Sequence, residues 1–179
     1  VGSEMCIRDS IHTWQGEANL FHTFHDESTL DVKAYYFYSE RGLPGAVILY
    51  NPKAEERLWD ENFFTQARYK KTFSPKWTLQ AQAKFNHSWN KYEDTDVKYE
   101  NGKQTDINRQ DEYYLSAAVL YQPVKGLELS LAQDGFINTL HTNINDSPNP
   151  VRYSSLTALN ARYQWGRIKL SGTLVGTFI

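Results

Sequence analysis

The sequence predicts an all-β protein, a fragment of an antiparallel transmembrane β-barrel with about eight long strands arranged in four hairpins. Three observations predict this class. Apolar and polar residues alternate with a period of two, which is the side-chain period of a β-strand. The alternating segments are unusually long, and the connections between them are short and long in turn. Bacterial outer-membrane barrels combine short periplasmic turns with long extracellular loops in this way.

The alternation is clearest between Trp77 and Trp89. One face of this segment carries Trp77, Leu79, Ala81, Ala83, Phe85, His87 and Trp89, and the other carries Thr78, Gln80, Gln82, Lys84, Asn86 and Ser88. A strand of about 13 residues, tilted by about 45°, climbs roughly 30 Å, the thickness of a bilayer's hydrocarbon core. Indole rings favour the two interfaces of a bilayer, so Trp77 and Trp89 indicate that this face contacts lipid. A soluble sheet is the alternative interpretation of this segment.

Seven other segments alternate in the same manner. We expect strands at about Thr13–Phe24, Thr29–Glu40, Leu58–Thr72, Arg109–Gln122, Leu127–Ala132, Val151–Trp165 and Ile168–Ile179. Short turns are expected at His25–Ser28, Ser74–Lys76, Pro123–Gly126 and Gly166–Arg167. Long connections are expected at about Arg41–Arg57, Lys91–Asn108 and Asn138–Pro150. Apolar residues recur at intervals of two and not three or four, which excludes a helical protein, and a β-sandwich gives no such strict alternation of connection lengths.

Composition narrows the function classes. The net charge of −2 and the pI near 6.2 provide no basic surface for nucleic acid. No run of residues approaches the apolar length of a transmembrane helix, but the strands of a barrel hide their hydrophobicity by alternating it with polar residues. The single cysteine, Cys6, excludes an internal disulfide framework and a multi-cysteine metal cluster.

The chain divides into two parts. Residues Val1–Ser10 show no alternation and lack the apolar segment of a signal peptide, so we expect a non-structural leader. They resemble a translated adapter sequence, and a disordered natural leader is the alternative. Residues 11–179 are expected to form the partial barrel.

Eight strands could close into a small barrel. If the short turns are periplasmic, however, the first strand descends from the outside and the last strand climbs towards it. A self-contained outer-membrane barrel is expected to start and finish in the periplasm. The face opposite the lipid is also rich in Lys, Arg, Gln, Asn and Asp, which suits a wide wet lumen. We therefore expect a piece of a larger barrel.

Three short runs extend this interpretation to a family. Ser39–Val47 resembles the end of a strand and the start of an extracellular loop in TonB-dependent outer-membrane receptors. Ser88–Asp94 and Gln110–Ser116 resemble the branch of that family close to cobalamin receptors. The family resemblance covers about residues 11–179. It implies a barrel of about 22 strands with an N-terminal plug and a segment that binds the coupling protein TonB, neither of which is present in this sequence.

The resemblance implies a location in the outer membrane, with the lipid bilayer, a missing plug domain, the remaining strands, TonB and a large nutrient ligand as partners. The implied function is the active uptake of a large scarce nutrient, either a corrinoid such as cobalamin or a metal–siderophore complex. Two alternatives remain. One is a passive porin or a small structural barrel, and the other is a soluble periplasmic or extracellular β-protein.

Few residues are candidates for specific chemistry. Glu93, Asp94 and Asp96 could bind calcium through carboxylate oxygens, although a solvated loop explains them as well. The lumenal cations Lys33, Arg68, Lys84 and Arg162 could face an anionic plug or ligand, or simply solvate the channel wall. The histidines at positions 12, 22, 25, 87 and 141 have no ligand spacing, and we expect His22 and His87 to pack at the membrane interface. No Ser-His-Asp set, nucleophile elbow or phosphate loop occurs, so we expect neither enzymatic activity nor a cofactor.

Overall fold

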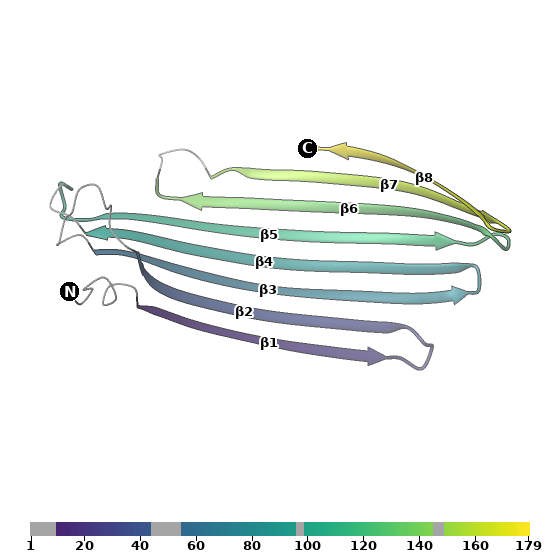
Figure 1. The fold of residues 1–179 in the computed structure, drawn as a ribbon, viewed down its shortest axis with the longest axis horizontal. Helices are drawn as coiled ribbons and strands as arrows, with labels where there is room; N and C mark the ends of the chain where they lie inside the picture. The colour runs from purple at the N-terminus through teal and green to yellow at the C-terminus, as the bar shows by residue number, and fades with distance from the viewer. Residues whose placement is uncertain (1–9, 44–54, 96–98, 145–148) are drawn as a thin grey trace.

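A computed structural model describes residues 10–43, 55–95, 99–144 and 149–179 of the chain. It confirms the predicted fold class, because the described residues form one sheet of eight antiparallel strands (Figure 1). The strands are β1 (Ile11–Thr23), β2 (Thr29–Leu43), β3 (Glu55–Ser74), β4 (Trp77–Thr95), β5 (Gln104–Tyr121), β6 (Leu127–Thr142), β7 (Val151–Trp165) and β8 (Ile168–Phe178). None of the described residues lies in a helix that is long and apolar enough to cross a membrane.

The strands follow one another in the sheet in the order of the sequence, from β1 to β8. Each strand pairs with its neighbours in the chain, and β1 and β8 are the two outer strands of an open sheet in the described structure. The four short turns lie together at one end of the sheet, to the right in Figure 1. The chain passes from β2 to β3, from β4 to β5 and from β6 to β7 at the opposite end, as the sequence predicts.

The strand register places the alternating residues on two distinct faces. Residues that are directly opposite each other in an antiparallel pair point to the same side of the sheet. One continuous row joins Leu79, Val119, Leu131, Leu159 and Leu174 across five strands. We call the side with this row the apolar face.

The opposite side of the sheet is the polar face. A row on this side joins Arg68, Gln82, Ser116 and Asp134 across four strands. The division that the sequence predicts for Trp77–Trp89 is therefore continued by every strand that pairs with it.

Several strands run further towards the long connections than the sequence predicts. Strand β4 continues to Thr95, β5 begins at Gln104 and β6 ends at Thr142. Beyond Trp89 both faces carry polar residues, so the alternation of hydrophobicity fades while the backbone ladder continues. Cross-strand polar pairs replace apolar ones there, and periodicity does not detect them.

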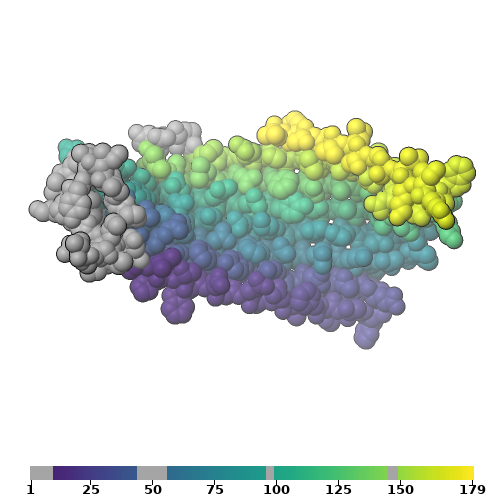
Figure 2. Space-filling model, in the orientation of Figure 1, coloured from purple at the N-terminus to yellow at the C-terminus, as the bar shows by residue number. Residues whose placement is uncertain are grey.

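The described residues form a single-layered sheet without a hydrophobic core. No apolar side chain among the described residues is buried, and Trp14, Trp165 and Phe178 are 73%, 73% and 76% exposed. Figure 2 shows the strands side by side as one elongated body. Leu79, Ala81, Ala83 and Phe85 therefore lie on an open face and not at the centre of a closed body.

Residues 1–9 of the expected leader, and Gly45 and Pro52 of the first long connection, lie outside the described residues. Ser10 is described, and its carbonyl oxygen accepts a hydrogen bond from the backbone N–H of Gly42 at 3.1 Å. Backbone pairing of the first strand with β2 therefore reaches the last residue of the expected leader.

The turn between β5 and β6 contacts the end of β7. Gly126 has φ = 90°, a conformation that favours glycine. Its carbonyl oxygen accepts a hydrogen bond of 2.7 Å from the backbone N–H of Gln164. A Cβ atom at Gly126 would lie 2.5 Å from the Gln164 carbonyl oxygen, so the close approach of the two backbones requires glycine.

Candidate functional site

The polar face is the candidate functional surface, because it collects the charged side chains that the sequence analysis assigns to the lumen. Strand register places Lys33, Arg68, Lys84 and Arg162 on this face, on β2, β3, β4 and β7. Each forms an ion pair with an acid of a neighbouring strand. These pairs are Lys33–Glu17 at 2.9 Å, Arg68–Asp31 at 2.5 Å, Lys84–Glu112 at 3.3 Å and Arg162–Glu128 at 3.7 Å.

Three of these cations line one hollow of about 290 Å³ over β1 to β5. Lys33, Arg68 and Lys84 border it, together with Asp31 and Tyr114. The cations lie on adjacent rows of the sheet, because Lys33 is opposite Gln66, which is opposite Lys84, and Arg68 is one row away. Their acidic partners lie beside them, so the hollow is polar but its positive charge is compensated.

Next to this hollow, towards the long connections, the polar face carries neutral amides and aromatic rings. The Asn62 amide donates a hydrogen bond of 3.4 Å to Asn86, and the Asn108 amide donates one of 3.0 Å to Asn90. Tyr35 and Phe64 stack beside them with ring centroids 5.3 Å apart. Alternation places Asn86 on the polar side of its strand, but it does not predict this group, since the amides of each pair are far apart in the sequence.

Aromatic rings border the apolar face towards both ends. Near the short turns, Trp77 stacks on Tyr121 with ring centroids 4.1 Å apart. Towards the other end, Trp89 and Trp14 follow on β4 and β1. Between these ends a shallow hollow of about 630 Å³ crosses the sheet, and most of the residues that line it belong to the apolar face. Small residues, among them Ala67, Ala83 and Gly135, contribute to it.

One polar cluster interrupts the apolar face and was missed by the sequence analysis. Gln133 of β6 donates a hydrogen bond of 2.7 Å to Ser155 and accepts one of 2.5 Å from Thr157, both on β7. Gln133 lies one residue past the predicted end of its strand, at a position where the alternation calls for an apolar residue. A polar residue, Gln133, at a position where the alternation requires an apolar one is the sequence signal that could have identified this cluster.

His22 and His87, which were both expected to pack at the membrane interface, have different contacts in the structure. The His22 ring makes an edge contact with Phe24, with centroids 4.5 Å apart, as expected for packing. The Nδ1 atom of His87 lies 2.5 Å from an Asp111 carboxylate oxygen, so this histidine joins a polar pair that the sequence did not predict. Among the described residues no three His, Cys, Asp or Glu side chains gather in a way that could hold a metal ion.

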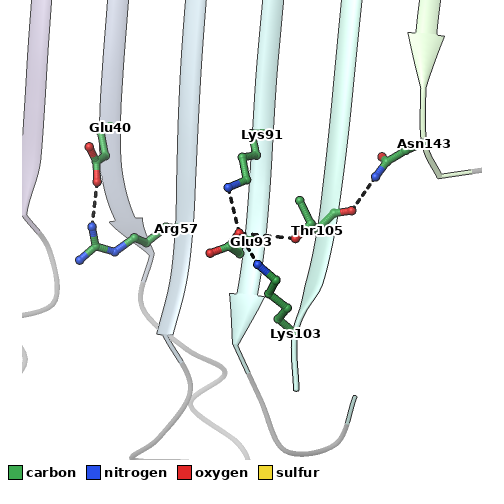
Figure 3. A network of polar contacts seen from close by, with 7 residues as sticks. All are labelled: Glu40, Arg57, Lys91, Glu93, Lys103, Thr105 and Asn143. Atoms are coloured by element: carbon green, nitrogen blue, oxygen red, sulfur yellow. Dashed lines mark hydrogen bonds and ion pairs between the residues drawn. The ribbon is translucent and has the colours of Figure 1, made fainter. Parts of the chain in front are cut away.

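The side of the sheet that continues the apolar face beyond Trp89 carries a polar network, which Figure 3 shows from close by. Arg57 pairs with Glu40 at 2.8 Å, and Lys91 and Lys103 approach Glu93 at 2.9 and 3.7 Å. The Lys91 ammonium beside Glu93 lowers the pKa of that carboxyl below its ordinary value. On this side of the sheet, the aromatic rings that border the apolar face are thus followed by charged residues towards the long connections.

The structure separates two of the three calcium candidates. Glu93 and Asp94 are consecutive residues of β4, so their side chains leave opposite faces of the sheet. Glu93 is held by lysines, and Asp94 accepts a hydrogen bond of 2.7 Å from the Tyr99 hydroxyl. Asp96 lies outside the described residues, so calcium binding by this connection stays a prediction.

Two solved structures have a similar fold. The FpvAI–pyocin S2 complex matches with a TM-score of 0.58 and 12% sequence identity over 90% of this chain. P. aeruginosa FpvA, bound to heterologous pyoverdines in an iron complex, matches with a TM-score of 0.58 and 10% identity over 87% of this chain. The likeness is one of fold. The chain spans about a quarter of these proteins, covering 26% and 25% of their lengths.

The siderophore receptor PirA from Pseudomonas aeruginosa also matches, over 92% of this chain and 36% of its own length, with 11% identity and a TM-score of 0.37. No protein-family model and no curated protein matches the sequence. The cobalamin-receptor resemblance of Ser88–Asp94 and Gln110–Ser116 finds no support among these matches.

Proposed function

We propose that this chain is part of the wall of an outer-membrane TonB-dependent receptor that takes up a large scarce nutrient. The observation that carries the proposal is an eight-stranded sheet with an open apolar face, an opposite polar face and no buried apolar core among its described residues. In water such a face needs a second layer to cover it. In a bilayer, lipid covers it, and the polar face lines the interior of the barrel.

The fold likeness to FpvA supports the same proposal, and further strands would close the sheet into a barrel. The transported ligand is then a ferric siderophore, on the likeness to FpvA bound to pyoverdines in an iron complex, with a corrinoid as the second candidate on the resemblance of the Ser88–Asp94 run. The barrel wall guides the ligand, while a plug moved through TonB opens the path. The wall itself performs no chemical reaction, so the receptor is not an enzyme.

Cysteine labelling tests the orientation of the two faces with four matched substitutions. Ala81 and Ala117 are opposite each other on the apolar face, and Ala118 and Ala132 are opposite each other on the polar face. Each would be replaced by Cys in the full-length gene product, in a background in which every native cysteine is replaced by Ser, and in native outer membranes. We expect a thiol probe dissolved in the lipid to modify Cys at 81 and 117, and a charged maleimide to modify Cys at 118 and 132.

Two results would contradict the proposal. In a soluble β-protein, the lipid-dissolved probe would modify none of the four positions. In a passive porin the labelling would be as proposed, but uptake of a radiolabelled ferric siderophore or cobalamin would continue after an uncoupler collapses the proton gradient. Active uptake predicts that the uncoupler stops it.

A further inference from the structure

The charges of the polar face leave little net attraction for a highly charged ligand. Besides the four ion pairs of Lys33, Arg68, Lys84 and Arg162, Arg41 pairs with Asp60 at 3.0 Å. On the described strands, the remaining cations of this face, Lys70, Arg152 and Lys169, are outnumbered by its remaining acids, Glu56, Asp94, Asp106 and Asp134. A multiply anionic ligand would have to break existing ion pairs to bind the five paired cations, and the excess of acids on the rest of the face repels it.

The neutral groups of this face are arranged differently. Asn62, Asn86, Asn90 and Asn108 form two hydrogen-bonded pairs on three adjacent strands, and we call these four residues the amide patch. Each pair uses one donor and one acceptor, and a carboxamide has two of each. Among the described residues the remaining N–H and C=O groups of these half-buried amides have no further partner, so they can bind a ligand on the polar face.

Aromatic rings border the amide patch on both sides. Tyr35 and Phe64 stack on the β2 side, and Tyr114 and Phe136 on the β6 side, with ring centroids 5.3 and 4.8 Å apart. Phe64 is directly opposite Asn86, so amide and ring lie in the same row. Precisely placed hydrogen-bonding groups among aromatic surfaces are the usual composition of a site for an organic ligand.

We infer that the amide patch is a contact surface for an electrically neutral ligand rich in amide or hydroxyl groups, and that the receptor discriminates against multiply anionic ligands. This inference rests on the proposed function, because it specifies what passes along the wall. The ligand classes that fit are a neutral ferric tris-hydroxamate and a corrinoid with amide side chains. A trianionic ferric tris-catecholate does not fit.

The test compares uptake of three radiolabelled probes by cells that carry the full-length gene product: a neutral ferric tris-hydroxamate, cyanocobalamin and a trianionic ferric tris-catecholate. We expect at least one neutral probe to enter and to be preferred over the catecholate. The double variant Asn62→Ala, Asn108→Ala should then raise the half-saturating concentration of that probe about five-fold or more, because each substitution removes a hydrogen-bonding group.

The matched control is Asn160→Ala, which removes an amide from the same face outside the patch, where it donates to Thr173 at 2.7 Å. We expect it to leave uptake unchanged. Preference for the catecholate, entry of no neutral probe, or equal effects of the patch and control variants would each overturn the inference. The labelling pattern at positions 81, 117, 118 and 132 distinguishes a failure of the inferred ligand class from a failure of the proposed function. If the uptake test fails but the labelling pattern is as expected, only the ligand class is wrong. If the labelling pattern is lost, the proposed function fails as well.

Discussion

At the scale of single residues, the turns at the short end of the sheet hold the most specific constraints. Gly126 combines a positive φ with a close approach to the Gln164 carbonyl oxygen, whereas Gly166 has a positive φ of 56° and open space around it. The two glycines therefore separate the cost of backbone strain from the cost of a steric clash.

We predict that Gly126→Ala destabilises the protein by roughly 2 kcal/mol or more, because strain and clash add. Gly166→Ala should cost about 1 kcal/mol, since strain acts alone there. The measurement is the thermal unfolding midpoint in detergent micelles, followed by tryptophan fluorescence. Equal midpoints for the two variants would show that the Gly126–Gln164 contact is not maintained.

A second residue-scale prediction concerns pH. The Asp26 carboxylate in the β1–β2 turn lies 2.7 Å from the Lys71 ammonium and accepts hydrogen bonds from Ser28, and these contacts lower its pKa. A lowered folded pKa means that stability is complete above the unfolded pKa of about 4 and is lost as the pH falls below it. We expect the unfolding midpoint of the unmodified chain to fall between about pH 5 and pH 2.

Asp26→Asn should flatten this part of the pH profile, whereas Glu27→Gln should leave it unchanged. Glu27 is an acid of the same turn for which the described structure shows no ion pair. An Asp26→Asn profile that still falls as steeply as that of the unmodified chain would assign the acid sensitivity to other carboxylates.

At the scale of elements, the end of the β5–β6 hairpin depends on a side chain. Past the last residue of β6, the Asn143 amide accepts a hydrogen bond of 2.6 Å from the Ile107 N–H and donates one of 2.8 Å to the Thr105 carbonyl. A carboxamide thus takes the place of a peptide group and extends the ladder, as the Asn143–Thr105 contact in Figure 3 illustrates. The sequence pattern could not predict that the Asn143 side chain extends the ladder, because Asn is also common in turns.

We predict that Asn143→Ala frays this hairpin end. The loss of a hydrogen bond worth about 1 kcal/mol should speed amide hydrogen exchange at Ile107 about five-fold. Asn138→Ala, within β6, is the control and should leave Ile107 protected. Unchanged exchange at Ile107 in Asn143→Ala would mean that the main chain alone holds the hairpin end.

The elements also show how far the sequence could predict the structure. The alternation from Trp77 to Trp89 was sufficient to place both faces, because the strands on either side continue the same apolar and polar rows. The ends of β4, β5 and β6 could not be placed, since polar cross-strand contacts such as Asn90–Asn108 join the strands there without an apolar alternation. The partners of Lys33, Arg68 and Lys84 depend on strand register, and strand register emerges when distant segments pair.

At the scale of the whole molecule, the described sheet has two open edges, β1 and β8, each paired along one side. Unpaired edges and an uncovered apolar face both promote association in water. We predict that the isolated chain forms large assemblies in buffer and that detergent disperses them. Analytical ultracentrifugation with and without detergent measures this.

A Leu174→Lys substitution on β8 should reduce association in buffer, because a charge on an edge strand opposes edge pairing. Leu174 is 71% exposed on the apolar face, so the substitution tests edge and face together. A monomeric chain in detergent-free buffer would favour the soluble β-protein over the membrane wall.

The consecutive order of the strands has a consequence for the evolution of such a protein. Every strand touches its immediate neighbours in the chain, so removal or duplication of one hairpin would leave the other pairings in place. The circumference of a closed β-barrel increases with its number of strands. A gene built in this way could gain or lose strands by whole hairpins, through unequal recombination, with new strand pairing needed only at the junction.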